Sequence, residues 1–390
     1  MKKISIIMAM LLLVMAALAG CSGSSDTAAT TAAGETTAAA AGETIKLGVI
    51  GPLTGEYSMY GTSVEEGAKL AAEEINAAGG INGSMVEIVA YDSKGDKTEA
   101  VNAYNRLRDQ DGIVGLIGGT FSGETLSIKE IAVGDNMPVL TPTATNGEVT
   151  LNAPNVFRAC YTDPYQGSTA AVFAAENLGA TKAAVLYNIE DPYSEGLAEA
   201  FNEKFSALGT VTNFEGYTAN DSDFKAVLTK IAESDPDVIF LPDYVAKVGI
   251  ILSQIQELGL DVVAIGGDGW DGIEVDYADV AEGDYFANHY ANTDEAPIVQ
   301  NFISAYEAKW GKTPSALAAL AYDSTYIMAQ AIEKAGSTDA DAIVAQLAAT
   351  DGDYVTGHIT FDENGDPVKS ISMIQVVGGK HVLAAKVSAE

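Results

Sequence analysis

Short apolar runs alternate with amphipathic segments from Thr44 onward. The first run, at 45–50, is rich in β-branched residues and predicts a strand. The next segment has apolar side chains at helical spacing, at Val64, Ala68, Ala71, Ile75 and Ala78. The pair Gly79-Gly80 ends this predicted helix. Further strands are predicted at 86–91, 113–117 and 138–140, with helices at about 97–109 and from Ser122. This alternation predicts an α/β fold with mostly parallel sheets flanked by helices on both faces.

A second set of strands and helices follows residues 161–164 and repeats the same architecture. It contains predicted strands at 182–187, 238–241 and 262–265. Asp191 and Pro192 are typical of a helix start, and Gly259 is typical of the end of the helix between the last two strands. Two further helices are predicted at 297–309 and 315–334. The residues after position 43 are also too many for one ordinary hydrophobic core, so we expect two lobes.

An Asn-Gly turn lies between two β-rich runs near the C-terminus. The runs at 359–361 and 371–376 flank Glu363, Asn364, Gly365 and Asp366, which predicts a hairpin. Asp362, Asn364 and Asp366 also resemble part of a calcium loop, but the bidentate glutamate of such a loop is missing. We therefore interpret this segment as a turn.

The first 21 residues are typical of a lipoprotein signal. Lys2 and Lys3 precede an apolar run at 4–18, and Leu18-Ala19-Gly20-Cys21 follows directly. An ordinary signal with a coincidental cysteine is the alternative interpretation. We expect the mature chain to begin at a lipidated Cys21, followed at 22–43 by a disordered tether of mainly Ala, Thr, Ser and Gly.

Composition excludes several classes of function. The formal net charge of −33 argues against nucleic acid or an anionic lipid surface as a partner. Cys21 and Cys160 are the only cysteines, and lipid on Cys21 would leave no internal disulfide. His289, His358 and His381 show no metal-ligand spacing, and the chain has no phosphate-binding loop and no nucleophile elbow. We expect no metal, no cofactor and no enzymatic activity.

Polar and aromatic residues follow six of the predicted strands, three in each half. Ligands of open parallel sheets bind at the carboxyl ends of the strands, so these segments are expected to converge. The segments are 51–60, 118–122, 141–145, 191–193, 242–244 and 266–270.

Each of these residues has a functional and a structural interpretation. Ser122 lies at a helix start and, together with Thr145, offers hydroxyls and free N–H groups to a carboxylate. A simple helix cap for Ser122 and a turn residue for Thr145 fit equally well. Asp268 between glycines is a candidate partner for an ammonium group, or a turn aspartate. Two roles, the wall of a ligand pocket and ordinary core packing, fit the aromatic residues Tyr60, Tyr193, Tyr244 and Trp270.

These motifs together resemble the leucine/isoleucine/valine-binding family of type I periplasmic binding proteins, which serve branched-chain amino acid ABC transporters. The resemblance extends from Thr44 to the C-terminus. It rests on Gly51-Pro52-Leu53-Thr54-Gly55, Tyr60-Gly61, Gly67 to Asn76, Gly79-Gly80-Ile81-Asn82-Gly83, Leu140 to Thr145, Tyr193-Ser194-Glu195-Gly196, Gly266 to Trp270 and Phe361 to Gly365.

The resemblance implies roles for seven residues. Ser122, Thr145 and the backbone of Thr143 would receive the ligand's α-carboxylate. Asp268, with Tyr193 and Tyr244, would surround the α-ammonium, and Tyr60 would contact the side chain. Two departures are an aspartate at 268, where relatives often have glutamate, and Phe121 at a place where some relatives have a disulfide. Family members also bind amides, aromatic acids and other small carboxylates, which leaves the side-chain preference open.

The resemblance further implies a two-lobed fold with three hinge crossings, expected near 160–163, 288–292 and 354–358. The N-terminal lobe would comprise 44–161 and 290–355, and the C-terminal lobe 162–289 and 356–390. The expected function is an extracytoplasmic, lipid-anchored, monomeric substrate-binding protein that delivers an amino acid to ABC permease subunits. A tethered sensor of the same fold, or a binding protein for another small carboxylate, is the alternative.

Overall fold

A five-stranded parallel sheet forms the first half of the molecule. The computed structural model describes residues 42–367 and 369–387, so the predicted signal, Cys21 and nearly all of the predicted tether lie outside the described residues. The strand order is β2-β1-β3-β4-β5, and every pairing is parallel. The strands are β1 (Ile45–Gly51), β2 (Val86–Asp92), β3 (Gly115–Gly118), β4 (Val139–Thr141) and β5 (Val156–Arg158).

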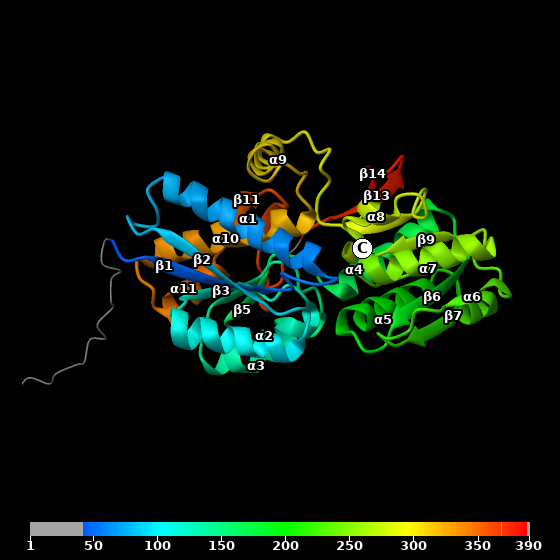
Figure 1. The fold of residues 1–390 in the computed structure, drawn as a ribbon, viewed down its shortest axis with the longest axis horizontal. Coiled ribbons are helices and arrows are strands. Elements are labelled where there is room, and N and C mark those ends of the chain that lie inside the picture. The colour runs from blue at the N-terminus through cyan, green and yellow to red at the C-terminus, as the bar shows by residue number, and fades with distance from the viewer. Residues whose placement is uncertain (1–41, 368, 388–390) are drawn as a thin grey trace, which may run out of the picture. The chain divides into compact units, whose positions relative to one another are not determined.

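Helices cover both faces of this sheet. In Figure 1, α1 and α10 lie along one face, and α2 and α3 lie along the other. The helices of this half are α1 (Ser58–Ala77), α2 (Lys97–Arg106), α3 (Ser122–Gly134), α9 (Pro297–Trp310), α10 (Ala316–Ala335) and α11 (Ala340–Ala348). We call the five-stranded sheet with these helices the N-terminal lobe.

A seven-stranded mixed sheet forms the second half, which we call the C-terminal lobe. Its order is β14-β13-β10-β9-β8-β6-β7, and β13 runs antiparallel to both β10 and β14. The strands are β6 (Lys182–Asn188), β7 (Thr210–Tyr217), β8 (Val238–Phe240), β9 (Val263–Gly266), β10 (Tyr285–Asn288), β13 (Ile371–Val377) and β14 (Lys380–Val387). Its helices are α4 (Asp163–Val172), α5 (Pro192–Ser206), α6 (Lys225–Ala232), α7 (Val245–Leu258) and α8 (Ile273–Tyr277).

Local signals explain where the helices begin and end. The Asp96 carboxylate accepts from the N–H groups of Thr98 and Glu99 and so caps α2, and the Ser315 hydroxyl caps α10 by accepting from the Ala318 N–H. Gly259 follows α7 at φ +65°, a left-handed conformation that favours glycine. The predicted helix end at Gly259 and the predicted helix start at Ser122 are confirmed.

The described chain passes between the two lobes at three places. The first passage joins β5 to α4, the second joins β10 to α9, and the third follows Pro367. The third lies later than our predicted crossing near 354–358, and the predicted lobe boundary at 355/356 is wrong for the same reason. Residues 361–367 still pack on the N-terminal lobe, because the buried Arg158 guanidinium bonds the Asp366 carboxylate and Phe361 packs on Phe157.

The predicted hairpin around Asn364 is wrong, although the turn itself is present. β12 (Gly357–Thr360) pairs with β11 (Asp351–Tyr354), whereas β13 pairs with β10 and β14. One isolated bridge, between Phe361 and Pro367, closes the turn. The Asp362 carboxylate accepts from the N–H groups of Asn364 and Asp366, so it is used within the turn.

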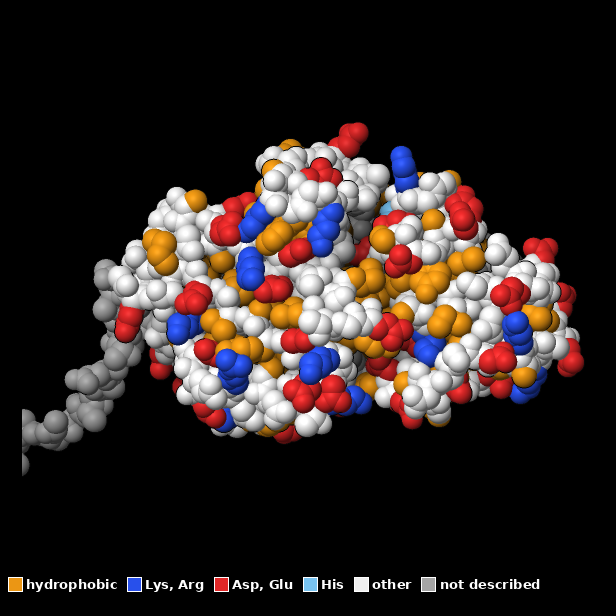
Figure 2. All heavy atoms as spheres, viewed as in Figure 1, with side chains coloured by type: hydrophobic (Ala, Val, Ile, Leu, Met, Phe, Trp, Pro, Cys, Tyr) orange, Lys and Arg blue, Asp and Glu red, His pale blue; other side chains and the backbone are white. Residues whose placement is uncertain are grey.

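Charge is dispersed over the face of the molecule that Figure 2 shows. On the face in Figure 2, acidic side chains are scattered over both lobes with basic side chains between them. Within residues 42–367 and 369–387, no helix has both the length and the apolar character needed to cross a bilayer.

Candidate functional site

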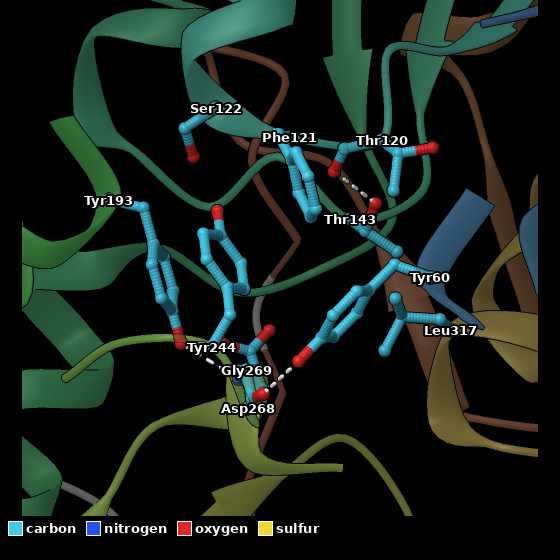
Figure 3. Close-up of a pocket in the computed structure, with 10 residues that line it drawn as sticks. All are labelled: Tyr60, Thr120, Phe121, Ser122, Thr143, Tyr193, Tyr244, Asp268, Gly269 and Leu317. Atoms are coloured by element: carbon cyan, nitrogen blue, oxygen red, sulfur yellow. Dashed lines mark hydrogen bonds between the residues drawn. The ribbon is translucent and has the colours of Figure 1, made fainter. Parts of the chain in front are cut away.

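A small cavity lies between the two lobes, with about 20 Å³ open to the centre of a water-sized sphere (Figure 3). Each of the six strand ends chosen from the sequence contributes at least one lining residue, which confirms their convergence. The lining residues are Tyr60, Thr120, Phe121, Ser122, Thr143, Tyr193, Tyr244, Asp268, Gly269 and Leu317.

The N-terminal lobe brings the start of α3 to the cavity. Phe121 precedes this helix, and its aromatic side chain cannot accept a hydrogen bond as a cap would. Ser122, the first residue of α3, is buried, and its hydroxyl accepts from the Asn146 N–H at 3.2 Å. The Thr143 hydroxyl donates to the Thr120 carbonyl at 2.6 Å, which fixes the neighbouring loop. N–H groups at a helix start with a hydroxyl beside them form a favourable site for an anion.

Two residues chosen from the sequence do not line the cavity. Thr145 is fully buried, and its side chain lies beside the Asp163 carboxyl group. Its carbonyl accepts from the Asp163 N–H at 2.8 Å, which holds this segment against the start of α4. Trp270 is also fully buried, and its indole N–H donates to the Leu241 carbonyl at 2.9 Å. Trp270 therefore packs in the core of the C-terminal lobe.

Asp268 is the charged residue of the cavity lining. It follows β9 in a 3₁₀ turn, Asp268–Trp270, and is 5% exposed. Its Oδ1 accepts from the Tyr193 hydroxyl at 2.9 Å and from the Gln166 amide at 3.1 Å. Its Oδ2 lies 2.9 Å from His289 Nε2. Asp268 is thus held from three sides by side chains of the same lobe.

The negative charge of Asp268 has no permanently cationic partner. Among the described residues, His289 is the one basic side chain within ion-pair distance of it. Burial lowers the pKa of His289, although the Asp268 carboxylate acts in the opposite direction. His289 is therefore neutral at neutral pH. A buried carboxylate that is bonded only by neutral donors favours a cationic ligand.

Aromatic rings from both lobes form the apolar wall of the cavity. The Phe121 and Tyr244 ring centroids are 4.5 Å apart, and Tyr60 lies 5.5 Å from Phe121 and 5.3 Å from Tyr244. Tyr193 stacks on Tyr244 at 5.0 Å. Burial raises the pKa values of Tyr60, Tyr193 and Tyr244 well above the ordinary value, so these phenols stay uncharged. Leu317 of α10 adds an aliphatic surface.

Two buried acids near the cavity carry raised pKa values. Glu124 of α3 has its pKa raised to about 7 by burial, and its carboxyl group accepts from Ser93 Oγ and the Phe121 N–H. Burial likewise raises the pKa of Asp243, just before Tyr244, to about 7. Both carboxyl groups are therefore partly protonated near neutral pH, which reduces the negative charge around the site.

Sequence reasoning missed Gln166 and His289 as contacts of Asp268. Gln166 lies on α4, where its amide carbonyl also accepts from the Asp268 N–H at 2.7 Å. His289 directly follows β10, a strand that the hydrophobic pattern did not predict. Neither residue carries a motif, and topology alone brings them to Asp268. The pairing of β9 with β10 places residue 289 beside the turn that follows β9. A prediction of that strand pairing would have pointed to His289.

Comparison with known proteins gives consistent matches over most of the chain. A family model described as periplasmic binding protein matches residues 44–380. A leucine-, isoleucine-, valine-, threonine- and alanine-binding protein of Pseudomonas aeruginosa is 33% identical over 331 residues, covering 84% of this chain and 88% of the relative. A Brucella melitensis homologue of Leu/Ile/Val-binding proteins is 32% identical over 336 residues, covering 84% and 89%.

Solved structures agree with these matches. A leucine-binding protein of Thermotoga maritima has a TM-score of 0.84 and 35% identity, covering 88% of this chain and 99% of that chain. A branched-chain amino acid transporter substrate-binding protein of Streptococcus pneumoniae, solved with isoleucine, has a TM-score of 0.84 and 33% identity, covering 89% and 100%. The predicted fold class, two lobes of mostly parallel sheets flanked by helices, is confirmed.

Proposed function

The chain belongs to the periplasmic binding protein family, and from this premise we propose that it captures a branched-chain amino acid between its lobes and delivers it to an ABC permease. The proposed ligand contacts are Tyr60, Ser122, Thr143, Tyr193, Tyr244 and Asp268. Thr145 is left out of this set because its side chain does not reach the cavity lining.

The observation that carries this proposal is the unpaired charge of Asp268. Asp268 is 5% exposed, and the hydrogen-bond donors to its carboxylate are a phenol, an amide and a neutral imidazole. A buried anion is costly unless a cation compensates it. The α-ammonium group of an amino acid would supply that cation from outside the protein.

The opposite end of the cavity suits the α-carboxylate. Ser122, the first residue of α3, lies across the cavity from Asp268, and Thr143 lies beside Thr120 (Figure 3). Charge-assisted hydrogen bonds of this kind contribute about 1.5–3 kcal/mol each before ordering costs. A few of them suffice for micromolar binding, which corresponds to about −8 kcal/mol.

The wall between these two ends suits an apolar side chain. Tyr60, Phe121, Tyr244 and Leu317 present rings and methyl groups in this region. The cavity is small, so it favours an aliphatic side chain over a larger aromatic one. The named relatives that bind leucine, isoleucine or valine support the same class of ligand.

The proposal includes the setting in which the protein acts. We propose that Cys21 carries lipid, that residues 22–43 tether the lobes outside the cytoplasm, and that the protein works as a monomer without catalysing a reaction. Cys21→Ser should abolish incorporation of labelled palmitate. Labelled palmitate in that variant would contradict lipidation at this residue. Deletion of the gene should also reduce leucine uptake, whereas unchanged uptake would indicate a sensor.

A thermal-shift screen tests the ligand class. The body from Glu43 onward would be heated with each proteinogenic amino acid, small amides and aromatic acids. A ligand at a hundredfold its dissociation constant stabilises the folded state by about 2.7 kcal/mol. We expect shifts with leucine, isoleucine and valine, and no shift with the same ligands in Asp268→Asn. Shifts confined to carboxylates without an amino group would contradict the proposal.

A further inference from the structure

His289 occupies a fixed, fully buried position behind the cavity. Its ring stacks on Tyr161, with centroids 3.8 Å apart and planes inclined by 22°. Its Nε2 lies 2.9 Å from Asp268 Oδ2, and its backbone N–H is bonded to the Asn288 side chain. His289 does not itself line the cavity, so it would act on a ligand only through Asp268.

The contact with Asp268 determines where the imidazole proton lies. An ionised carboxylate only accepts hydrogen bonds, so the proton of a neutral His289 must be on Nε2. The other ring nitrogen, Nδ1, is buried and has no hydrogen-bond partner in the described part of the chain. The ring is therefore anchored by a single polar contact, and that contact is made to the acid of the cavity.

The two oxygens of the Asp268 carboxylate are held by different side chains. Tyr193 and Gln166 both bond Oδ1, whereas His289 is the side chain that bonds Oδ2. Loss of the imidazole N–H would leave Oδ2 without a donor, and the carboxylate could then rotate. Gain of a second proton would instead turn His289 into a cation in contact with Asp268.

We infer that His289 is a positioning residue, which holds Asp268 toward the ligand's ammonium group when neutral and competes with that group when protonated. The inference rests on the proposed function, because it assumes an ammonium ligand. It predicts that binding releases a proton from His289 at acidic pH. Affinity therefore falls as the pH is lowered through the range where His289 gains its proton.

Other charged groups act on His289 and on the cavity. Asp268 favours the protonated form of His289, and Lys369, on the segment before β13, opposes it. Tyr161 is uncharged, because burial raises its pKa well above the ordinary value. Burial also raises the pKa values of nearby acids. Glu124 and Asp243 titrate at about 7 and Asp271 at about 6, and the pKa of Asp163 is raised well above its ordinary value. The pH profile of the unmodified protein alone therefore does not identify His289.

Two substitutions separate the roles of the ring. His289→Phe keeps an aromatic ring against Tyr161 but removes the donor to Asp268. His289→Gln keeps a neutral amide donor but cannot become a cation. His358→Gln is the matched control, because His358 is exposed on β12 and pairs with Asp353 away from the cavity.

The experiment measures L-leucine binding by calorimetry on the full-length protein in detergent, at pH 7.5 and pH 5.5. We expect His289→Phe to weaken binding about 10- to 100-fold at pH 7.5 and His289→Gln to stay within about threefold. The unmodified protein and His358→Gln should lose more affinity at pH 5.5 than His289→Gln does. Equal affinity in His289→Phe, or equal pH profiles in the unmodified protein and His289→Gln, would overturn the inference.

A second measurement needs no ligand. Nuclear magnetic resonance of the histidine rings should show His289 with its proton on Nε2, and Asp268→Asn should make protonation of this ring still harder. An unchanged His289 titration in Asp268→Asn would overturn the inference. Failure of leucine to bind the unmodified protein would instead count against the proposed function, and the ring titration would still decide whether His289 and Asp268 are coupled.

Discussion

The Tyr60 hydroxyl of the N-terminal lobe donates to the Gly269 carbonyl of the C-terminal lobe at 2.6 Å. The same oxygen accepts from the Val245 N–H at 2.9 Å. One phenol thus joins α1 to the turn after β9 and to the start of α7. These bonds exist only while the lobes are together, so they stabilise the closed arrangement around the cavity.

Tyr60→Phe should weaken ligand binding by favouring the open arrangement. The ring of the wall is kept, but the Gly269 carbonyl and the Val245 N–H lose their partner in the closed form, at a cost of about 1–3 kcal/mol. We expect the leucine dissociation constant to rise about tenfold, measured by calorimetry.

The matched control is Tyr91→Phe, which removes the hydroxyl bonded to Asp111 on the outside of the N-terminal lobe. It should bind leucine normally. Equal affinities in the two variants would show that the Tyr60 bonds do not contribute to closure.

Asp268→Asn should abolish most of the affinity for amino acids. The substitution keeps the size of the side chain but removes the charge that faces the ammonium group. Removing one partner of a buried charge pair costs about 2–5 kcal/mol, or roughly 30- to 5,000-fold in affinity. The melting temperature without ligand should change little, because the carboxylate has no permanently cationic partner to lose. Leucine binding at the original affinity would show that Asp268 is not the ammonium partner.

Phe121→Ala should change which side chain is preferred. Phe121 meets Tyr244 at 4.5 Å across the cavity, so its removal enlarges the apolar wall. We expect leucine to lose about 1–3 kcal/mol and phenylalanine to gain relative to leucine. Competition calorimetry measures both. The control is Phe214→Ala, because Phe214 is exposed on β7. An unchanged side-chain preference in Phe121→Ala would place the side-chain subsite elsewhere.

Asp284→Asn should change how stability depends on pH. Asp284 is buried between β9 and β10, its Oδ1 accepts from the Ala264 N–H, and burial raises its pKa from 3.8 to about 7. The folded state therefore binds more protons than the unfolded state between these values, so stability falls as pH rises from about 4 to 7.

The asparagine variant lacks this titration and can accept the same hydrogen bond. We expect it to be more stable than the unmodified protein at pH 8, by on the order of 2–4 kcal/mol, with little difference at pH 4. Urea unfolding across this range measures the difference. Parallel stability curves for the two proteins would contradict the raised pKa.

The sequence predicted the cavity better than it predicted the contacts within it. Because the carboxyl ends of parallel strands meet at one edge, segments as distant as Tyr60 and Asp268 were expected together, and both line the cavity. Thr145 has the same position relative to its strand, yet its side chain lies beside Asp163. The direction of a side chain in a loop depends on tertiary hydrogen bonds that spacing does not encode.

The hairpin near the C-terminus failed for a related reason. Asn364 and Gly365 correctly predicted a turn, but the turn is held by the contact of Asp366 with Arg158, more than two hundred residues earlier. Long-range contacts, rather than the local turn signal, therefore determine which strands pair. His289 and Gln166 were missed because a single polar residue in an apolar context gives no local signal of its partner.

The strand order of the C-terminal lobe bears on how the chain matures. β10 lies between β9 and β13, and β13 belongs to the last segment of the described chain. As a nascent chain lengthens, the β13-facing edge of β10 stays open while all of α9, α10 and α11 are being made. That lobe can be completed only after residues 371–377 have been made, so premature termination before residue 371 would leave an unpaired, aggregation-prone edge in the lobe that carries Asp268.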